Sequence, residues 1–316
     1  MRLATFDTAN GPEHVGVILS DDRILDLTSL APNDEAFESM TQMIRAGASA
    51  LGRAQDALDA AMGASGPTTT RRPEVLPLGS VRLRAPIPRP TKNVFCVGLN
   101  YRSHVEMNAA ALGIQPEIPS VPLFFTKPPT AVVGSGDAIH LDARITQKLD
   151  YEVELGVVIG RGGSWIDEAD ALSHVFGFTL VDEVSARDVQ WRTSQMFIGK
   201  GLDTYCPIGP WIVTSDEQDG SDVELTCRVN GEVRQLDSTS QLIFGLPRII
   251  AELSKGLTLE PGDIISTGTP GGCGYQMVPP RFLAPTDVVE CSAPGFGRLV
   301  NPVVAWPPNA VEDREP

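Results

Sequence analysis

One stretch, residues 151–160, constrains the fold most, because it places two carboxylates on an otherwise apolar and β-branched strand. Successive side chains of a strand point to opposite faces, so Glu152 and Glu154 share one face, about 6.5–7 Å apart along the chain. Two neighbouring carboxylates on such a strand are costly unless their charge is compensated. A hard divalent cation with oxygen ligands would compensate both. The alternative is an edge strand whose polar face lies in water.

Length and composition exclude several classes of protein. The 316 residues suffice for one large domain, or for a large and a small one, and the apolar fraction of 42% supports a sizeable core. No apolar run reaches 18 residues and the N-terminus lacks a signal-peptide core, so we expect neither a membrane span nor secretion. The five scattered cysteines argue against a disulfide framework or a zinc cluster and favour a cytoplasmic protein. A net charge of −15 argues against nucleic acid as a partner.

The chain is expected to divide near residue 88. Three short strands open it, at residues 3–6, 14–19 and 23–27. Residues 34–62 have the composition of one or two helices, interrupted near Gly47, and a linker-like run follows at residues 63–70. We therefore predict a small N-terminal α/β domain, residues 1–88, and a second domain, residues 89–316, that carries the chemistry.

Two residues early in the second domain are candidates for a site. His104 follows a predicted buried strand, and histidine is the usual general base near neutral pH. Glu106 is the nearest acid, but side chains two positions apart on a regular helix do not face each other. Lys127 ends an aromatic strand directly before two prolines, so it is either held in a pocket or lies along the surface. For both His104 and Lys127 a purely structural role is the competing interpretation.

Two more acids, Asp182 and Glu183, directly follow a predicted strand at residues 178–181. Either can supply a third ligand to a cation on Glu152 and Glu154. Arg187 offers a planar fork for a substrate carboxylate. Lys200 lies between two glycines, where backbone can approach a ligand closely.

Other local patterns complete the expected fold. Asp167 is a good helix N-cap, and the apolar spacing after it predicts a helix over residues 167–176. Asn230-Gly231 predicts a β-hairpin, and Pro247 lies in the first turn of a predicted helix. The Gly-rich loop 268–274 fits neither nucleotide-binding pattern, although its N–H groups and the Thr269 hydroxyl suit an anionic ligand.

Taken together and in order, these residues resemble the fumarylacetoacetate hydrolase family over about residues 90–305. The motifs that carry the resemblance are Gly98-Leu99-Asn100-Tyr101 with His104, Phe125-Thr126-Lys127-Pro128, Glu152-Val153-Glu154, Val184-Ser185-Ala186-Arg187-Asp188, Lys200 with Cys206-Pro207, Val229-Asn230-Gly231-Glu232, and Glu260-Pro261-Gly262-Asp263 with Thr267-Gly268-Thr269-Pro270. The resemblance implies an α+β, mainly β fold, a mixed sandwich-like roll that forms a homodimer. It also implies Mg²⁺ or Mn²⁺ held by three carboxylates.

The sequence departs from the family pattern at two places. Aligned on the Ser185-Ala186-Arg187-Asp188 run, the third ligand falls on Glu183 where the family has aspartate, with Asp182 as the alternative. Related enzymes often pair the histidine with a glutamate three residues later, but here that position is Met107 and the nearest acid is Glu106.

The resemblance implies a role for each candidate residue. The metal ligands are Glu152, Glu154 and Glu183. The catalytic residues are His104, Glu106, Arg187 and Lys200. The substrate-binding residues are Tyr101, Lys127, Gln190 and Thr269.

The expected reaction is hydrolysis of a C–C bond in a 1,3-diketo, acylpyruvate-type 2-oxo acid, through an enolate that the metal stabilises while His104 activates water. The same platform serves decarboxylation, keto–enol isomerisation and hydration of 2-oxo acids, and the altered histidine partner makes a lyase or an isomerase the closest rival. A metal-binding protein without turnover is a further alternative of a different class.

Overall fold

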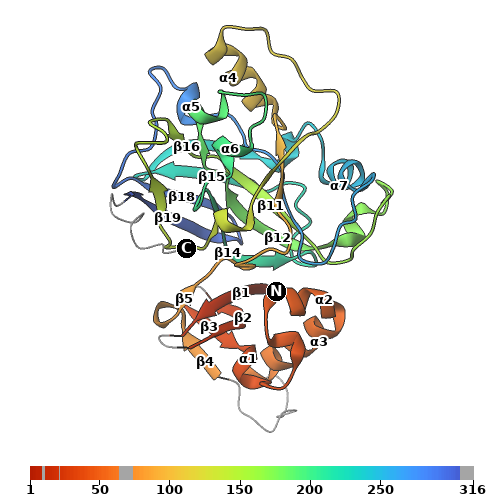
Figure 1. Cartoon of the computed structure of the whole chain (residues 1–316). Helices are drawn as coiled ribbons and strands as arrows, with labels where there is room; N and C mark the ends of the chain where they lie inside the picture. Colours follow the sequence, from red (N-terminus) through yellow and green to blue (C-terminus); the bar gives the residue numbers. More distant parts are fainter. Residues whose placement is uncertain (9–10, 21, 64–73, 307–316) are drawn as a thin grey trace, which may run out of the picture.

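The computed structural model describes residues 1–8, 11–20, 22–63 and 74–306 (Figure 1). Most of the predicted linker at residues 63–70, and the end of the chain after Trp306, lie outside the described residues. Among the helices that are described, none has both the length and the apolar character needed to cross a membrane.

The N-terminal segment is a small α/β unit, as its sequence predicts. Its strands are β1 (Arg2–Asp7), β2 (Glu13–Ser20), β3 (Arg23–Asp26), β4 (Glu74–Pro77) and β5 (Arg82–Leu83). Its helices are α1 (Leu27–Leu30), α2 (Met40–Ala46) and α3 (Ala48–Ala61). The break between α2 and α3 falls on Gly47, whose φ of 55° suits glycine because it lacks a Cβ.

The N-terminal unit continues into the main sheet of the molecule. The strand order is β4-β3-β2-β1-β14-β12-β11-β17-β6-β7, and β1 joins β14 antiparallel through Leu3 and Ile212. The bounds of the further strands are β6 (Val94–Gly98), β7 (Leu123–Lys127), β11 (Val153–Ile159), β12 (Val175–Asp182), β14 (Cys206–Thr214) and β17 (Ile264–Ser266). The division near residue 88 stays a prediction.

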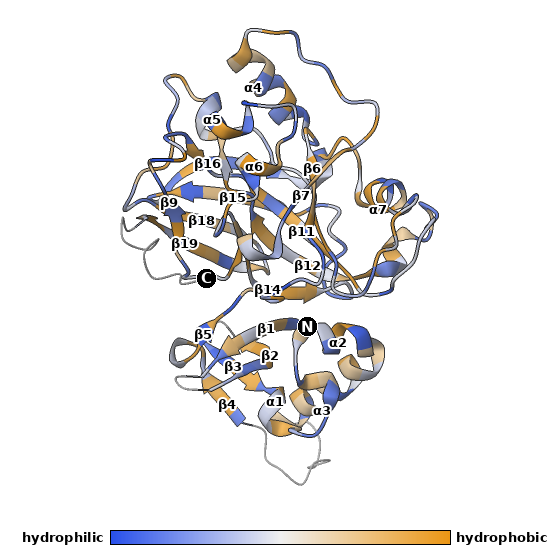
Figure 2. Cartoon of the chain, in the orientation of Figure 1, coloured by the Kyte–Doolittle hydropathy of each residue, from blue (hydrophilic) through white to orange (hydrophobic). Residues whose placement is uncertain are grey.

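The strand that carries the two glutamates lies inside the sheet and not at its edge. β11 pairs with β12 on one side and with β17 on the other, and every residue of β11, β12 and β14 is buried. Figure 2 shows hydrophobic residues gathered along β11 and β14. The edge-strand alternative for Glu152 and Glu154 is therefore wrong, and both carboxylates lie inside the protein.

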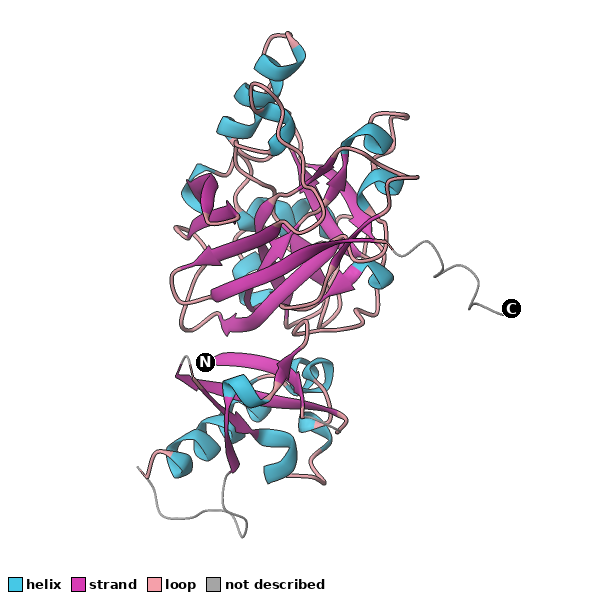
Figure 3. Ribbon diagram, turned by 90° about the vertical axis from the view of Figure 1, so that its left-hand side faces the viewer, coloured by secondary structure: helices cyan, strands magenta, loops and turns pink. Residues whose placement is uncertain are grey.

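A second, five-stranded sheet lies against the first. Together with strands β6–β14 and β17 it forms the larger part of the molecule, which Figure 3 shows above the N-terminal unit. The order of the second sheet is β16-β15-β18-β19-β9, with bounds β9 (Ile139–Leu141), β15 (Glu224–Val229), β16 (Glu232–Ser238), β18 (Val288–Ala293) and β19 (Gly297–Ala305). The β15–β16 hairpin turns at Asn230-Gly231, both with positive φ, as predicted. One buried apolar cluster includes Leu155, Leu180, Leu225 and Leu299 from both sheets. The mainly β, mixed fold is confirmed.

Helices and short strands fill the periphery of this larger part. The helices are α4 (Arg102–Leu112), α5 (Arg187–Gln190), α6 (Phe197–Lys200) and α7 (Leu246–Ser254). Three short strands are β8 (Val132–Val133), β10 (Leu149–Asp150) and β13 (Ser185–Ala186), and β10 pairs with β13.

The helix predicted over residues 167–176 is wrong. Only a single 3₁₀ turn forms, Ala171–His174, and β12 begins at Val175. Val175 pairs with Ile159 of β11, and the carbonyl of Phe176 accepts from the N–H of Ser215. Sheet pairing in the core thus overrides the local helical spacing.

Candidate active site

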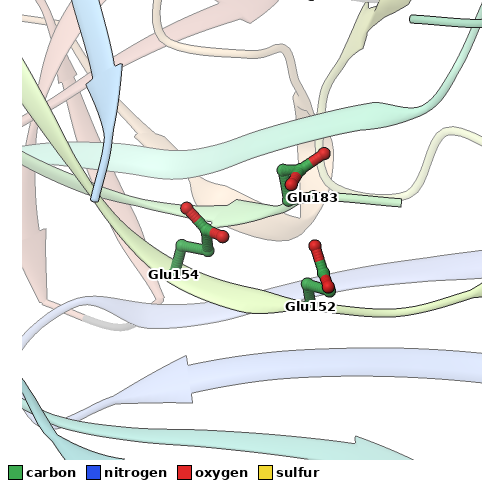
Figure 4. Close-up of side chains that lie close together, drawn as sticks. All are labelled: Glu152, Glu154 and Glu183. Carbon is green, nitrogen blue, oxygen red and sulfur yellow. The ribbon is translucent and has the colours of Figure 1, made fainter. Parts of the chain in front are cut away.

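Three buried carboxylates meet at the ends of two neighbouring strands. Glu152 lies just before β11, Glu154 lies within it, and Glu183 follows β12 (Figure 4). One oxygen of each lies within 4.8 Å of the others, and each residue is at most 3% exposed. We call this group the carboxylate cluster. Asp182 lies apart from it, because its Oδ1 accepts from the backbone N–H of Glu152 at 3.0 Å.

The carboxylate cluster has the chemistry of a divalent-cation site. Burial, followed by the charges of Glu183 and Glu152, raises the pKa of Glu154 well above its usual value. Burial also raises the pKa of Glu183. Burial acts the same way on Glu152, but the charges of Arg187 and Lys200 outweigh it and bring that pKa well below its usual value. The carboxylate cluster therefore offers hard oxygen ligands whose negative charge the neighbouring cations do not fully compensate. Such a ligand set suits Mg²⁺ or Mn²⁺.

The raised pKa of Glu154 predicts how a cation stabilises the fold. A carboxyl whose pKa is higher in the folded state than in the unfolded state costs more stability as the pH rises and the group ionises. A bound cation removes that cost. Adding Mg²⁺ or Mn²⁺ to chelator-stripped protein should therefore raise the melting temperature more at pH 8 than at pH 6, as calorimetry would show. Glu154→Gln, which cannot ionise, should lose most of this pH dependence; an equal increment at both pH values in the unaltered protein would contradict the assignment.

Lys200 supplies positive charge on the cavity side of the carboxylate cluster. Its Nζ lies 2.7 Å from Glu152 Oε2 and 2.5 Å from Glu183 Oε2, and it also donates to the Ser185 hydroxyl at 3.0 Å. Burial opposes the charged form, but the two carboxylates outweigh it and raise the pKa of Lys200 above its usual value. Lys200 therefore stays protonated and ties two of the three candidate ligands together.

Lys127 lies behind Glu183. It is fully buried, and its Nζ donates to the carbonyls of Val184, Lys200 and Tyr205. The same Nζ lies 2.9 Å from Glu183 Oε1. Lys127 is not among the residues that line the cavity, and it does not lie along the surface, so neither position expected from the sequence is found. It holds a metal-ligand candidate in place.

Arg187 is bonded mainly to the protein itself. Its Nε donates to Asp150 at 2.9 Å, its Nη2 to Glu152 at 2.7 Å and its Nη1 to Gln190 at 3.2 Å. Its guanidinium carbon lies 4.4 Å from the ring centre of Tyr275. The guanidinium thus orients Glu152 as well as facing the cavity.

Asp150 is a residue of the site that the sequence reasoning missed. Besides Arg187, it accepts from the N–H groups of Gly274 and Tyr275, at 2.7 and 3.2 Å. The N–H of Gly268 donates to Glu154 in the same way, at 2.7 Å. The N–H groups of the Gly-rich loop therefore bind carboxylates of the protein. The alternation rule would have found Asp150, which precedes Glu152 by two positions.

A cavity of about 240 Å³ opens onto the carboxylate cluster. Of the residues predicted for the site, it is lined by Glu152, Glu154, Glu183, His104, Arg187, Lys200, Gln190 and Thr269. Apolar side chains complete its wall, among them Leu112, Leu123, Phe125 and Trp191. The cavity therefore combines a polar, charged floor with an apolar mouth, as small-molecule sites do.

Two further predicted residues are not brought to this cavity. Glu106 is exposed on α4 and does not line the cavity beside His104, because residues two apart on a helix point in different directions. Tyr101 is fully buried beside the site, where it forms a bridge with Leu242, and it does not line the cavity either. His104 and Glu106 do not pair in the structure, as their spacing on a regular helix indicates.

His104 instead lies against the loop that follows the glycines. Its Nδ1 is 3.3 Å from Gln276 Nε2 and 3.7 Å from Cys273 Sγ. Burial, with Arg187 and Lys200 adding to it against the charge of Glu152, lowers the pKa of His104 to about 4. The imidazole is therefore neutral at neutral pH. Neither Gln276 nor Cys273 carries a sequence signal that would have placed it here.

The chain matches the family described as fumarylacetoacetate (FAA) hydrolase C-terminal, over residues 93–304. It belongs to this family. The match covers the strands from β6 to β18, most of β19 and every residue of the carboxylate cluster, while β1–β5 precede it. The chain is therefore an enzyme of the fumarylacetoacetate hydrolase family. The homodimer that the resemblance implies stays a prediction.

Three relatives show where the chain lies within the family. "Oxaloacetate tautomerase YisK" from Bacillus subtilis (strain 168) is 41% identical over 308 residues, which cover 96% of this chain and 100% of that protein. The structure of a fumarylacetoacetate hydrolase from the psychrophile Exiguobacterium antarcticum is 37% identical, with a TM-score of 0.78 over 97% of this chain and 100% of that one. A maleylpyruvate hydrolase from Sphingobium sp. SYK-6, in complex with manganese (II) ion and pyruvate, is 29% identical, with a TM-score of 0.74 over the same shares.

Proposed function

We propose that this protein is a metal-dependent tautomerase that interconverts the keto and enol forms of a 2-oxo dicarboxylic acid of the oxaloacetate class. The observation that carries the proposal is that, among the residues the structure describes, His104 has no carboxylate at hydrogen-bond distance and lies instead against the amide of Gln276. A carboxylate partner strengthens a histidine as a base toward water, whereas enolisation consumes no water. The likeness to a tautomerase over the whole chain supports the same reaction.

The residues that would hold the cation are Glu152, Glu154 and Glu183. When bound, Mg²⁺ or Mn²⁺ supplies Lewis acidity that acidifies the C3–H bond of a 2-oxo acid and stabilises negative charge on its C2 oxygen. The relative bound to manganese and pyruvate supports a cation together with a 2-oxo acid at this position. The oxygen-only ligand set also favours these cations over zinc.

The remaining side chains bind and orient the substrate. In the reaction the C3–H bond breaks and its proton passes to solvent, while an O–H bond forms at the C2 oxygen with a proton from solvent, so no carbon–carbon bond changes. The Lys200 ammonium faces the developing negative charge. Thr269 lines the cavity, and its hydroxyl is held in place because it donates to the Val153 carbonyl at 2.9 Å and accepts from Gln235 at 2.8 Å. The apolar mouth of the cavity limits the access of water.

The C–C hydrolase expected from the family resemblance is the second candidate. It is supported by the likeness to a maleylpyruvate hydrolase and by the position of His104 in the wall of the cavity. This reaction needs a ring nitrogen of His104 that accepts a proton from water. The lack of a carboxylate beside that ring among the described residues favours the tautomerase.

The enol absorbance of oxaloacetate tests the proposal. Chelator-stripped protein should speed the approach to keto–enol equilibrium only after Mg²⁺ or Mn²⁺ is added, while pyruvate and CO₂ stay at the uncatalysed level. An acylpyruvate in a parallel assay should be cleaved far more slowly. Metal-dependent release of pyruvate and a second acid would support the hydrolase instead, and metal-dependent release of CO₂ would make the protein a decarboxylase.

A further inference from the structure

We infer that Gln276 is a positioning residue that holds His104 in the neutral tautomer with its proton on Nε2. The cavity would then meet an N–H donor and not a basic nitrogen. The tautomer is independent of the proposed function, whereas its consequence for catalysis rests on that function.

The amide of Gln276 has only one orientation that satisfies its neighbours. Its Oε1 accepts from the backbone N–H groups of Gly272 and Cys273, at 2.8 and 3.1 Å. Its Nε2 must therefore face His104, where it lies 3.3 Å from Nδ1 and 3.3 Å from the His104 carbonyl. An amide nitrogen only donates hydrogen bonds, so the facing Nδ1 has to be the acceptor.

The other polar groups around the ring fit the same tautomer. The Cys273 thiol, 3.7 Å from Nδ1, has an S–H that can donate to the same nitrogen. With Nδ1 turned toward the Gln276 amide and the Cys273 thiol, Nε2 is the nitrogen left to carry the proton of the neutral ring.

Two other histidines show the opposite arrangement. His174 Nδ1 lies 2.7 Å from the Arg161 carbonyl, while its Nε2 lies 2.9 Å from the Arg161 guanidinium. That histidine must carry its proton on Nδ1. His14 Nδ1 lies 2.7 Å from an oxygen of Asp26, which likewise requires a proton on Nδ1. These residues serve as internal controls for His104.

The tautomer determines what His104 can do to a substrate. A carboxylate at Nδ1 would place the proton there and leave Nε2 as a base for water. The Gln276 amide reverses this, so Nε2–H can stabilise an enolate oxygen as a neutral donor but cannot accept a proton from water. An amide in place of a carboxylate beside Nδ1 would thus favour tautomerisation over hydrolysis.

Nitrogen-resolved NMR of the imidazoles tests the tautomer directly. The full chain, labelled with ¹⁵N-histidine and loaded with Mg²⁺, contains four histidines, and His104→Asn identifies the signals of His104. We expect the protonated nitrogen of His104 to be Nε2 and that of His174 to be Nδ1. A proton on Nδ1 of His104 would overturn the inference. The expected tautomer in a protein without tautomerase activity would uphold the inference and overturn the proposed function.

Gln276→Glu is the matched variant. One carboxylate oxygen can still accept from Gly272 and Cys273, while the other becomes an acceptor for His104. We expect the proton to move to Nδ1 in the spectrum and the ratio of acylpyruvate hydrolysis to tautomerisation to rise at least about tenfold. In Gln276→Met, which loses the amide donor without adding an acceptor, the preference for Nε2 should weaken so that both tautomers appear, short of the full shift to Nδ1 expected for Gln276→Glu. Equal spectra for Gln276→Glu and the unaltered protein would contradict the role of Gln276.

Discussion

Glu152→Gln is expected to lower kcat/KM for oxaloacetate tautomerisation by about 10³-fold or more and to weaken binding of Mn²⁺ strongly. Glu152 is one of the three candidate ligands and also accepts from Arg187 and Lys200, at 2.7 Å each. The substitution keeps the size of the side chain but removes the charge that binds the cation. Initial rates at saturating metal, together with Mn²⁺ titration by electron paramagnetic resonance, measure both effects.

Glu106→Gln is the matched control for this substitution. Glu106 lies exposed on α4 and does not line the cavity, so its replacement should leave the rate within about twofold, as surface substitutions do. If Glu106→Gln lost as much activity as Glu152→Gln, the pairing of His104 with Glu106 would have to be reconsidered. If Glu152→Gln kept full metal-dependent activity, the metal site itself would be wrongly assigned.

Lys200→Met is expected to have the second largest effect. Without metal, it leaves Oε2 of both Glu152 and Glu183 buried without a cation, although Arg187 and Lys127 still pair with the Oε1 atoms. Loss of this buried positive charge should lower the free energy of unfolding by about 3–5 kcal/mol. Added Mg²⁺ should restore part of this loss, because the cation takes over compensation of the same carboxylates. Activity should fall about 10²–10³-fold even with metal, because a positive charge beside the developing enolate is lost.

Chemical denaturation with and without Mg²⁺, beside rate measurements, tests this second prediction. The control is Lys255→Met, which removes a surface pair with Glu252 and should leave both the unfolding midpoint and the rate nearly unchanged. A Lys200→Met protein as stable as the control in the absence of metal would show that Lys200 does not compensate the carboxylate cluster.

Local sequence patterns correctly predicted the features that depend only on neighbouring residues. Strand alternation placed Glu152 and Glu154 on one face, and the structure brings them within reach of one cation. The Asn230-Gly231 turn and the helix break at Gly47 follow from backbone conformations that few other residues adopt easily. The order of the motifs predicted the family, to which the chain belongs.

The predictions that the structure did not match, and the contacts that were not predicted, involve residues from distant parts of the chain. The helix expected after Asp167 does not form, because Val175 pairs with Ile159 in the sheet. No local sequence pattern predicts that pairing. Lys127 lies buried because carbonyls from three later residues converge on it. Gln276 reaches His104 from 172 residues away. Sequence spacing describes a residue's own strand or helix, whereas a partner that reaches it from another element depends on the tertiary fold.

Deuterium exchange at C3 of oxaloacetate in D₂O most directly tests the central claim, that the carboxylate cluster and its cation generate an enolate without breaking a carbon–carbon bond. NMR would follow the C3 protons and the carbon balance in the same sample, with Mg²⁺ and either the unaltered protein or Glu152→Gln. We expect metal-dependent exchange well above the uncatalysed rate, no excess pyruvate, and loss of the effect in Glu152→Gln. Exchange no faster than with Glu152→Gln, or exchange always accompanied by carbon loss, would show that the carboxylate cluster does not act in this way.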